Sequence, residues 1–356
     1  MKNTGSKIRI KDIARLAGVS EGTVDRVIHN RGEVSMKSCE AVKKVLAEMN
    51  YSPNILARSL ASKKQYIFAC LIPQHEVGDY WETVEIGFDQ AYEDFSQYNV
   101  MVTKYYFNQF DVNSFQGIAN QVVEENPDAV IIAPIFRNET IGFAERLHAL
   151  NIPFSFIDSM IENTGFLTYY GQNSFLSGYI AGKLLLSELE ENSQVIVIRT
   201  KRKGAASNQT LSRNEGFLHY IKANSLDKIQ LINAEIQDGD EENNLEILRQ
   251  IFQENNHVKA AITFNSKVYR LAGYLSELGK ADVKLIGYDL LEQNVEYLKQ
   301  DVVSYLIAQR PDKQAFLSVR DLCRELIFHQ EVKAVNYVPV DVLMKENIED
   351  YIVFQE

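Results

Sequence analysis

An alternation of short apolar segments with longer amphipathic ones, from about residue 66 to residue 307, is the strongest constraint on the fold of this 356-residue chain. The apolar segments are predicted as strands over 67–72, 100–106, 129–133, 154–157, 195–198, 230–233, 260–264, 284–287 and 303–307. The amphipathic segments are predicted as helices near 81–97, 112–126, 138–150, 173–190, 212–224, 241–255, 266–278 and 291–300. Strands that are apolar throughout and separated by helices favour parallel sheets covered on both faces. The predicted fold class is therefore α/β.

The series falls into two halves, which predicts two doubly wound lobes with a cleft between them. We assign residues 65–163 and 288–316 to one lobe and residues 164–287 and 317–356 to the other. Ligands of open parallel sheets bind at the carboxyl ends of the strands. A small-molecule site is therefore expected where the two lobes face each other.

Charge is distributed unevenly along the chain. The first 64 residues contain 13 Lys and Arg against 6 Asp and Glu, a net charge of +7, whereas the whole chain carries −11, which leaves −18 for the remainder. A basic segment attracts phosphate groups through counterion release, and an acidic one is repelled by them. Only the first 64 residues are therefore expected to touch nucleic acid. The alternatives are a solvated basic face on an ordinary helical domain, or a membrane-surface helix.

The basic segment begins with the pattern of two short helices joined by a tight turn. The helical patterns run from Ile10 to Leu16 and from Thr23 to Ile28. Between them, Gly18 suits a left-handed helix end, and Ser20 can cap the second helix. This arrangement is typical of a helix-turn-helix, whose second helix enters the major groove of DNA.

A third helix and a hinge follow. The helix is predicted from a Ser35 cap to Met49, with an apolar stripe formed by Val42, Val45, Leu46 and Met49. Pro53 disfavours helix in the residue before it, so the helix is expected to end by then. Residues 54–61 could form only a helix too short to be stable alone, so they should fold when something packs against them. The predicted domains are a head (1–50), a hinge (51–64) and a body (65–356).

These residues resemble the LacI/GalR (lactose and galactose repressor) family of bacterial transcriptional regulators. The resemblance rests on the run from Lys11 to Ser20, on Thr23-Val24 and Arg26-Val27, and on the hinge residues Tyr51, Pro53-Asn54, Ala57-Arg58 and Leu60. The body is similar, with weaker motifs, to periplasmic sugar-binding proteins of the ribose type. The resemblance implies a sequence-specific, cytoplasmic regulator, expected to be a repressor, that binds a pseudo-palindromic double-stranded DNA operator as a homodimer. It also implies allosteric control by a carbohydrate-like effector in the cleft, without a cofactor or a metal.

The resemblance further implies which residues contact DNA. Glu21, Gly22 and Arg26 face base edges, where Arg26 can donate two hydrogen bonds to a guanine and Glu21 can accept one from a cytosine. Leu60 is expected to wedge between base steps in the minor groove. The full expected set, including phosphate contacts, is Lys11, Ser20, Glu21, Gly22, Thr23, Arg26, His29, Ser35, Tyr51, Asn54, Ala57 and Leu60. The chain departs from the family pattern at Arg9, Asp25, His29 and Cys39, which leaves the operator sequence open.

In the body, the resemblance points to Arg213, within Arg-x-x-Gly-Phe, as the planar group that holds sugar hydroxyls. The other candidates follow predicted strands, although an Asp or Asn there also commonly caps the next helix, and a lone Trp is usually part of the core. The expected effector-binding set is Tyr80, Trp81, Phe136, Asp158, Arg213, Asn265, Asp289 and Gln309. Ser266 stands where a ribose site usually has Asp, and residues 134–136 stand in place of its Asp-Arg pair, which predicts a less acidic and more apolar pocket. A modified sugar, a sugar acid, a polyol and a nucleoside all remain open as ligands.

Other function classes fit the sequence less well. The chain has no Gly-x-Gly-x-x-Gly, phosphate-binding loop or His-Glu-x-x-His motif, and its six histidines are scattered, so an enzyme is not expected. An exported solute-binding protein would carry a signal peptide in place of the basic head. No apolar run is long enough to span a bilayer, so no membrane partner is expected. Three cysteines far apart in the sequence fit the reduced thiols of a cytoplasmic protein.

Overall fold

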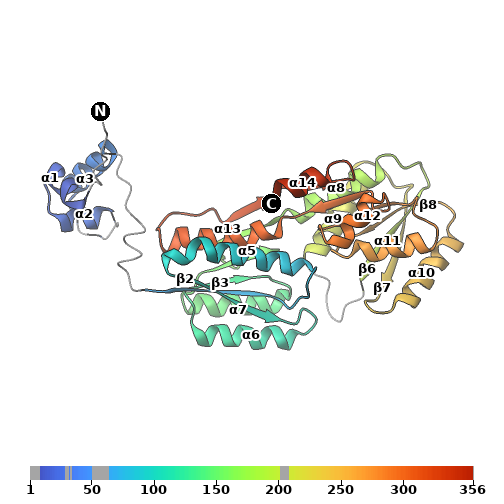
Figure 1. Cartoon of the computed structure of the whole chain (residues 1–356), viewed down its shortest axis with the longest axis horizontal. Helices are drawn as coiled ribbons and strands as arrows, with labels where there is room; N and C mark the ends of the chain where they lie inside the picture. Colours follow the sequence, from blue (N-terminus) through green and yellow to red (C-terminus); the bar gives the residue numbers. More distant parts are fainter. Residues whose placement is uncertain (1–8, 29–31, 33, 50–63, 201–207, 356) are drawn as a thin grey trace. The chain divides into compact units, whose positions relative to one another are not determined.

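The structure is a computed structural model that describes residues 9–28, 32, 34–49, 64–200 and 208–355. The chain divides into two compact units, Met1–Lys63 and Lys64–Glu356, which we call the head and the body. Each unit is described by itself (Figure 1).

The head contains the predicted helix-turn-helix. Its helices are α1 (Ile10–Ala17), α2 (Glu21–Ile28) and α3 (Met36–Glu48). Gly18 ends α1 in the left-handed conformation, with φ of 66°, where a residue with a side chain would be strained. The hydroxyl oxygen of Ser20 accepts a hydrogen bond of 3.1 Å from the backbone N–H of Thr23 and so caps α2. Both features agree with the sequence prediction.

The core of the head is small. Ile13, Ala14, Val24, Val42 and Val45 are buried, and the remainder of the predicted stripe on α3 packs against them. The Ser35 oxygen accepts a hydrogen bond from the N–H of Ser38, which confirms the predicted cap of α3. At the start of α1, Arg9 offers no acceptor, but the Asp12 carboxylate accepts a hydrogen bond of 3.1 Å from the Arg9 N–H. One of the helix's unpaired donors is thereby satisfied.

The body is built on two six-stranded sheets. The first sheet has the order β2 (Val100–Phe107), β1 (Tyr66–Pro73), β3 (Ala129–Ile132), β4 (Phe154–Asp158), β5 (Thr168–Gln172) and β11 (Val335–Val338). All of its neighbouring strands are parallel. In Figure 1, α5 (Tyr80–Phe95) and α13 (Pro311–Leu326) cover one face, while α6 (Val112–Glu125) and α7 (Arg137–Ala149) cover the other. A short 3-10 turn, η1 (Ser96–Tyr98), follows α5.

The second sheet repeats this plan. Its order is β7 (Gln230–Ile236), β6 (Gln194–Thr200), β8 (Val258–Thr263), β9 (Lys284–Tyr288), β10 (Tyr305–Ala308) and β12 (Asp341–Leu343). Only β12, which pairs antiparallel with β10, breaks the parallel pattern of this sheet. One face packs against α8 (Ser174–Leu186) and α9 (Asn208–Ala223). The other packs against α10 (Glu241–Glu254), α11 (Val268–Glu277), α12 (Glu292–Lys299) and α14 (Ile348–Gln355).

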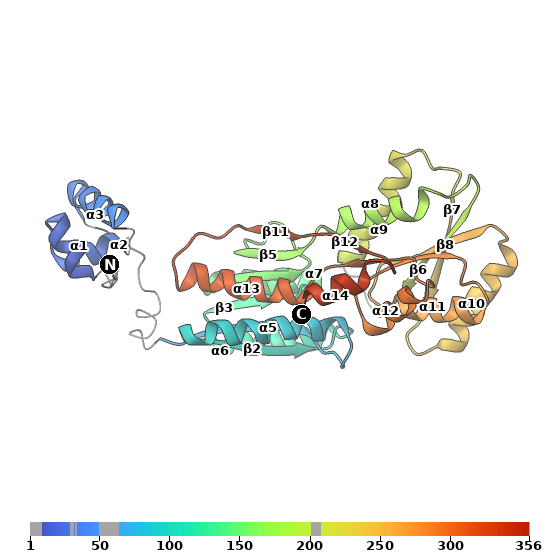
Figure 2. The same ribbon diagram turned by 45° about the horizontal axis from the view of Figure 1, so that its top comes forward.

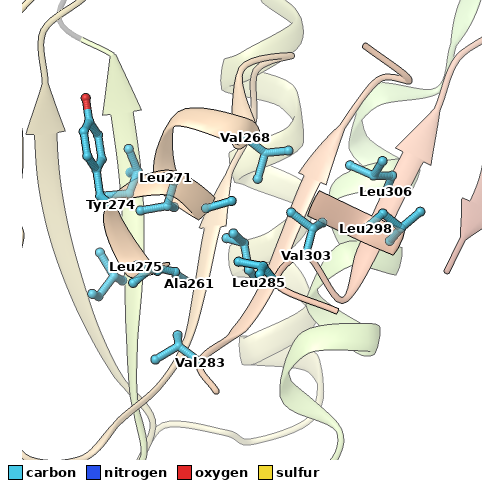
Figure 3. Packing of buried hydrophobic residues seen from close by; sticks show 14 of the residues in the cluster. Ala261, Val268, Leu271, Tyr274, Leu275, Val283, Leu285, Leu298, Val303 and Leu306 are labelled. Carbon is cyan, nitrogen blue, oxygen red and sulfur yellow. The ribbon is translucent and has the colours of Figure 1, made fainter. Parts of the chain in front are cut away.

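Alternating strand residues point to opposite faces, so each sheet supports a hydrophobic cluster on each side. Figure 3 shows one of these clusters in the second sheet, where Leu271 and Leu275 of α11 lie over Ala261 of β8 and Leu285 of β9. The strands are buried on both faces, which is why they are apolar throughout. The α/β fold class expected from that pattern is confirmed.

The predicted division into lobes is wrong for five elements. β5 and β11 belong to the first sheet, and α13 packs on that sheet. β10 belongs to the second sheet, and α12 packs on that one. The first lobe therefore comprises residues 64–172 and 311–338, and the second lobe residues 174–308 and 341–355. Figure 2 shows β11 beside β5.

Strand pairing over long sequence separations causes this difference. The sequence prediction also omits β5, β11, β12, α13 and α14, which lie outside the clear alternation. In the described residues the chain passes between the lobes after β5, after β10 and after β11. These three crossovers connect the two lobes of the body.

Candidate functional site

A cavity lies between the two lobes, at the carboxyl ends of strands from both sheets, where the sequence predicts a ligand. Every predicted effector residue except Phe136 lines it. Among the described residues, the lining consists of Asp79, Tyr80, Trp81, Gln109, Phe110, Ile135, Asp158, Thr200, Gln209, Thr210, Arg213, Asp238, Phe264, Asn265, Ser266, Lys267, Asp289 and Gln309.

Phe136 is a correction to the predicted site. Its ring packs against Phe107 of β2 and Phe115 of α6, with ring centroids 6.2 Å and 5.9 Å away. It therefore belongs to the hydrophobic cluster beneath the first sheet, and its neighbour Ile135 lines the cavity instead. A large ring gains more from burial among other rings than at the edge of a polar cavity.

The first lobe contributes most of the apolar wall of the cavity. Tyr80 and Trp81, at the start of α5, form an edge-to-face pair with ring centroids 5.0 Å apart. Phe110 and Ile135 extend the same wall. The Tyr80 hydroxyl donates a hydrogen bond of 2.9 Å to Oδ1 of Asp158. The rings thus combine a stacking surface with one fixed polar contact.

The second lobe contributes a buried cation, Arg213 of α9, which is 1% exposed. Its Nη1 donates to the Phe264 carbonyl oxygen at 2.8 Å, and its Cζ lies 3.8 Å from the centroid of the Tyr288 ring. Its Nε and Nη2 are buried and have no hydrogen-bond partner among the residues that the structure describes. Buried polar groups are nearly always paired, so these two donors suit acceptor atoms of a ligand.

Two glycines set the position of Arg213, because they let α8 and α9 cross closely. A Cβ on Gly178 of α8 would lie 1.9 Å from the backbone oxygen of Arg213. A Cβ on Gly216 of α9 would lie 1.9 Å from the backbone oxygen of Phe175. Phe217 then packs in the core beneath the helices. The Arg-x-x-Gly-Phe motif therefore combines a ligand donor, a helix crossing and a core anchor.

An aspartate stands at the end of the fourth strand of each sheet. Asp158 ends β4, and Asp289 follows β9. Both have left-handed backbones, with φ of 68° and 71°, and both are 5% exposed. Burial raises the pKa of Asp289 to about 6, although Arg213 and the hydrogen bond from Gln309 favour its ionised form.

Buried glutamines connect these aspartates, and the sequence analysis missed one of them. Gln309 donates a hydrogen bond of 2.7 Å to Oδ1 of Asp289. Gln209 donates 2.8 Å to Oε1 of Gln309 and 3.1 Å to Oδ1 of Asp158. Gln209 precedes Arg213 by four residues and therefore shares its helix face. That spacing is the signal by which the sequence could have revealed it.

Among the described residues, the lining carries four acidic side chains, Asp79, Asp158, Asp238 and Asp289, and the cations Arg213 and Lys267. Asp238 is paired with Lys267 at 3.2 Å and with Arg270 at 2.8 Å. Uncharged residues stand at positions 134–136 and 266. Asn265 also caps locally, because its Oδ1 accepts a hydrogen bond of 2.9 Å from the Lys267 N–H. The helix-capping alternative therefore describes part of its role.

On the head, the described DNA contacts that the sequence predicts belong to all three helices: Lys11 lies in α1, Ser20 caps α2, which contains Glu21 to Arg26, and Ser35 caps α3. Of these residues, Lys11, Ser20, Glu21, Gly22, Arg26 and Ser35 are exposed, while Thr23 is partly buried. His29, Tyr51, Asn54, Ala57 and Leu60 lie outside the described residues. Asp25, which departs from the family pattern, is half-buried on α2.

Three further features bear on other function classes. Residues 18–22 spell Gly-x-Ser-x-Gly, a pattern of hydrolases, but in those enzymes it joins a strand to a helix. Here it joins α1 to α2, and the Ser20 oxygen caps α2. Within the described residues no group of three or more His, Cys, Asp or Glu is placed to hold a metal ion. The helices described here include none long and apolar enough to cross a membrane.

Comparison with known families assigns both units of the chain. The periplasmic binding protein domain matches residues 68–330, and the bacterial regulatory proteins of the lacI family match residues 9–54. The transcriptional repressor PurR of Serratia proteamaculans is 23% identical over 349 residues, which cover 96% of this chain and 97% of PurR. The transcriptional regulator MalR of Streptococcus pneumoniae is 42% identical over 66 residues, 18% of this chain. The chain aligns with only 20% of the length of MalR.

Solved structures agree with this assignment. The crystal structure of a candidate LacI transcriptional regulator from Bacteroides fragilis is 40% identical, with a TM-score of 0.76, over 81% of this chain and 100% of that one. GanP, a glucose-galactose binding protein from Geobacillus stearothermophilus, is 19% identical, with a TM-score of 0.70, over 80% of this chain and 99% of that one. The second likeness shows the fold alone. The expected family is confirmed: the chain belongs to the lacI family of bacterial regulatory proteins, the DNA-binding transcriptional regulators that join a helix-turn-helix head to a periplasmic-binding-protein body.

Proposed function

We propose that this regulator is a repressor that binds a pseudo-palindromic operator as a homodimer in the cytoplasm and is released when a neutral, polyhydroxylated effector binds between its lobes. A single short recognition helix contacts too few base pairs for useful specificity, which favours a symmetric dimer on a symmetric site. The exposed Lys11, Glu21 and Arg26, together with the net charge of +7 on the first 64 residues, support DNA binding by the head.

Arg213 is the observation that carries the effector proposal. A buried guanidinium with two unpaired N–H donors is costly unless a ligand supplies acceptors. The donors face a cavity that also holds the carboxylates of Asp158 and Asp289, which can accept hydrogen bonds from hydroxyl groups. A vicinal pair of hydroxyls, each both donor and acceptor, fits this arrangement.

The charge of the cavity favours a neutral ligand over a sugar acid. Among the described residues of the lining, four aspartates outnumber two cations, which disfavours a ligand carboxylate beside them. The rings of Tyr80, Trp81 and Phe110 can stack on the apolar face of a sugar ring. GanP, which has the same fold, is described as a glucose-galactose binding protein.

A nucleoside is the second candidate ligand. The same aromatic wall could stack on a base while the carboxylates accept hydrogen bonds from ribose hydroxyls. The full-length similarity to PurR is compatible with a regulator that senses something other than a sugar. Neither candidate changes the roles proposed for Arg213 and the two aspartates.

A thermal-shift screen of the full-length protein tests the ligand class. The panel consists of neutral pentoses and hexoses, their uronic acids, polyols and nucleosides. A specific ligand raises the melting temperature in a concentration-dependent way, because it binds only the native state. Neutral sugars should give the largest shifts and uronic acids none. Shifts confined to uronic acids would contradict the charge argument.

Gel shifts with genomic fragments test the DNA half of the proposal. Arg26→Ala should cost about 1–3 kcal/mol at the selected site and relax the preference at one base pair. Lys11→Ala is the matched variant, which should weaken all sequences alike and flatten the salt dependence. Unchanged sequence preference in Arg26→Ala would show that α2 is not the recognition helix.

Coupling between the two sites can then be measured in both directions. The screened ligand should lower operator affinity by roughly 1–3 kcal/mol, and the operator should lower ligand affinity by the same factor. Sedimentation of the protein alone and with operator measures the stoichiometry. A monomer that binds a half-site tightly at micromolar concentration would rule out the homodimer.

A further inference from the structure

One side chain, the carboxamide of Gln209 in α9, joins the two lobes directly across the cavity. Its Nε2 lies 3.1 Å from Oδ1 and 3.4 Å from the backbone oxygen of Asp158, which belongs to the first lobe. The same nitrogen lies 2.8 Å from Oε1 of Gln309, in the crossover between β10 and α13. Gln209 is 9% exposed, so these bonds are shielded from competing water.

The contact is part of a longer network that holds its partners in place. Gln309 passes the connection on to Asp289 through its own Nε2, at 2.7 Å. Asp158 is held from its own lobe by the Tyr80 hydroxyl and by Oε1 of Gln314, which accepts a hydrogen bond of 2.9 Å from the Asp158 N–H. The Gln314 Nε2 donates to the Gln309 backbone oxygen at 2.8 Å. Oδ1 of Asp158 and Oε1 of Gln309, which accept the hydrogen bonds of Gln209, are therefore held in place by their own lobe or crossover. The hydrogen bonds of Gln209 consequently restrain the position of one lobe relative to the other.

Gln209 and Arg213 lie on the same face of α9, one helical turn apart. Both line the cavity, and among the described residues Nε and Nη2 of Arg213 have no hydrogen-bond partner. The hydrogen bonds of Gln209 take up acceptor positions on Asp158 and Gln309 that a hydroxylated ligand would otherwise use.

We propose that Gln209 is a positioning residue that latches the two lobes together in the effector-free protein, and that the effector must displace it from Asp158 to bind. The latch lowers effector affinity, because the ligand competes with an intramolecular donor. Effector binding also changes a contact of the first lobe, because the ligand replaces Gln209 as a hydrogen-bond donor to Asp158. This second part rests on the proposed effector function, whereas the latch itself does not.

The first experiment measures the distance between the lobes in the full-length protein without any ligand. Spin labels are placed on exposed helix positions, one on each lobe, through Gln116→Cys in α6 and Asn243→Cys in α10, in a Cys39→Ser background. Cys70 and Cys323 are fully buried and so should not take the label. Pulsed dipolar spectroscopy then gives the distribution of interlobe distances.

Two variants of Gln209 and one control decide the outcome. Gln209→Ala should broaden the distribution and move it to longer distances. Gln209→Glu, nearly the same shape, should do the same, because a carboxylate cannot donate to Asp158 or to Oε1 of Gln309. Gln109→Ala should leave the distribution unchanged, since the Gln109 side chain lines the same cavity without a hydrogen bond to any described residue. Distributions of both Gln209 variants that superimpose on the parent would overturn the latch.

The second experiment measures affinity with D-glucose, D-galactose, D-arabinose and uridine as probes. Gln209→Ala should bind the tightest of these about fivefold to tenfold more strongly, the amount expected when one competing hydrogen bond is removed. Weaker binding by Gln209→Ala would mean that Gln209 is a ligand contact and not a competitor, which contradicts the displacement. If no probe binds the parent protein, the proposed ligand class fails, and the distance distributions still decide the latch.

Discussion

The two lobes share one architecture but make different contributions to the cavity. Each sheet carries its aspartate at the end of the fourth strand, with nearly the same left-handed backbone and the same low exposure. The first lobe surrounds Asp158 with rings and the Tyr80 hydroxyl, whereas the second lobe places Asp289 near the buried Arg213. The scaffold therefore supplies two equivalent anchor points, and the neighbouring side chains decide which becomes a stacking surface and which a charged binding site.

The helix pairs on the two lobes are also alike in architecture and different in the side chains that they carry. In the first lobe, a Cβ on Gly87 of α5 would lie 2.1 Å from the backbone oxygen of Asp312 in α13. In the second lobe, Gly178 allows the corresponding close approach of α8 and α9. Both lobes thus use a glycine to bring two helices together, and the second crossing holds the buried guanidinium of Arg213.

The largest effect should come from Arg213→Met, which keeps the volume of the side chain and removes its donors. Effector affinity should fall by about 3 kcal/mol or more, roughly a hundredfold, because hydrogen bonds to a charged group are lost in a buried site. Trp81→Leu in the first lobe should cost only about 1 kcal/mol of binding, the size of a stacking contribution. Calorimetry with the best ligand of the screen measures the effector affinity of both variants. Equal losses of affinity would contradict the proposal that the two lobes contribute differently to binding.

A smaller effect is expected from overpacking the helix crossings. Gly87→Ala and Gly178→Ala should each lower the free energy of unfolding by about 2–3 kcal/mol, because the added methyl group meets backbone atoms that cannot move aside. Urea denaturation measures this cost. Only Gly178→Ala should also weaken effector binding, since its clash displaces the backbone of Arg213. Effector binding that is unimpaired in folded Gly178→Ala would show that the crossing does not position the arginine.

Asp289→Asn should stabilise the protein at pH 7.5 by about 2 kcal/mol while it weakens effector binding. The native pKa of Asp289 is raised to about 6 from 3.8, so its ionised form destabilises the folded state above pH 6. As the pH falls through 6, the native protein takes up the proton and this cost fades, so the advantage of Asn should vanish near pH 4. Urea denaturation at pH 7.5, 6 and 4.5 measures the trend. A stability difference that does not change with pH would contradict the shifted pKa.

Tyr80→Phe should have the smallest effect, a loss of about 1 kcal/mol in the free energy of unfolding, because one buried hydrogen bond to Asp158 disappears. The ring remains, so stacking on a ligand should be retained. Affinity that changes by less than about threefold in calorimetry would agree with a wall that acts mainly through its rings. A loss of effector affinity as large as that in Arg213→Met would show that the Tyr80 hydroxyl makes a polar contact with the ligand.

Much of this organisation follows from the sequence because its signals are local. The left-handed Gly18, the caps formed by Ser20 and Ser35, and the apolar stripe on α3 depend on residues close together in the chain, and the structure has all of them. Runs of aliphatic residues predict the central strands for the same reason. Asp289 and Asp158 could be named as cavity residues because the carboxyl ends of parallel strands gather at one edge of a sheet. Arg213 is expected there because its Arg-x-x-Gly-Phe motif resembles that of the ribose-type proteins.

Only the tertiary structure decided how the lobes exchange segments and what the cavity residues contact. β5 and β11 pair across more than 160 residues, as the bond from Thr168 to the Lys333 carbonyl shows, and no local pattern encodes such a partner. Phe136 and Ile135 are neighbours with similar apolar character, and the packing of Phe136 on Phe107 and Phe115 decides that Ile135 faces the cavity. The link from Gln209 to Asp158 joins the two lobes in the same way. Sequence determines what a residue can do through its chemistry and local geometry, whereas its partner and its burial depend on long-range packing, which exists only once the chain has folded.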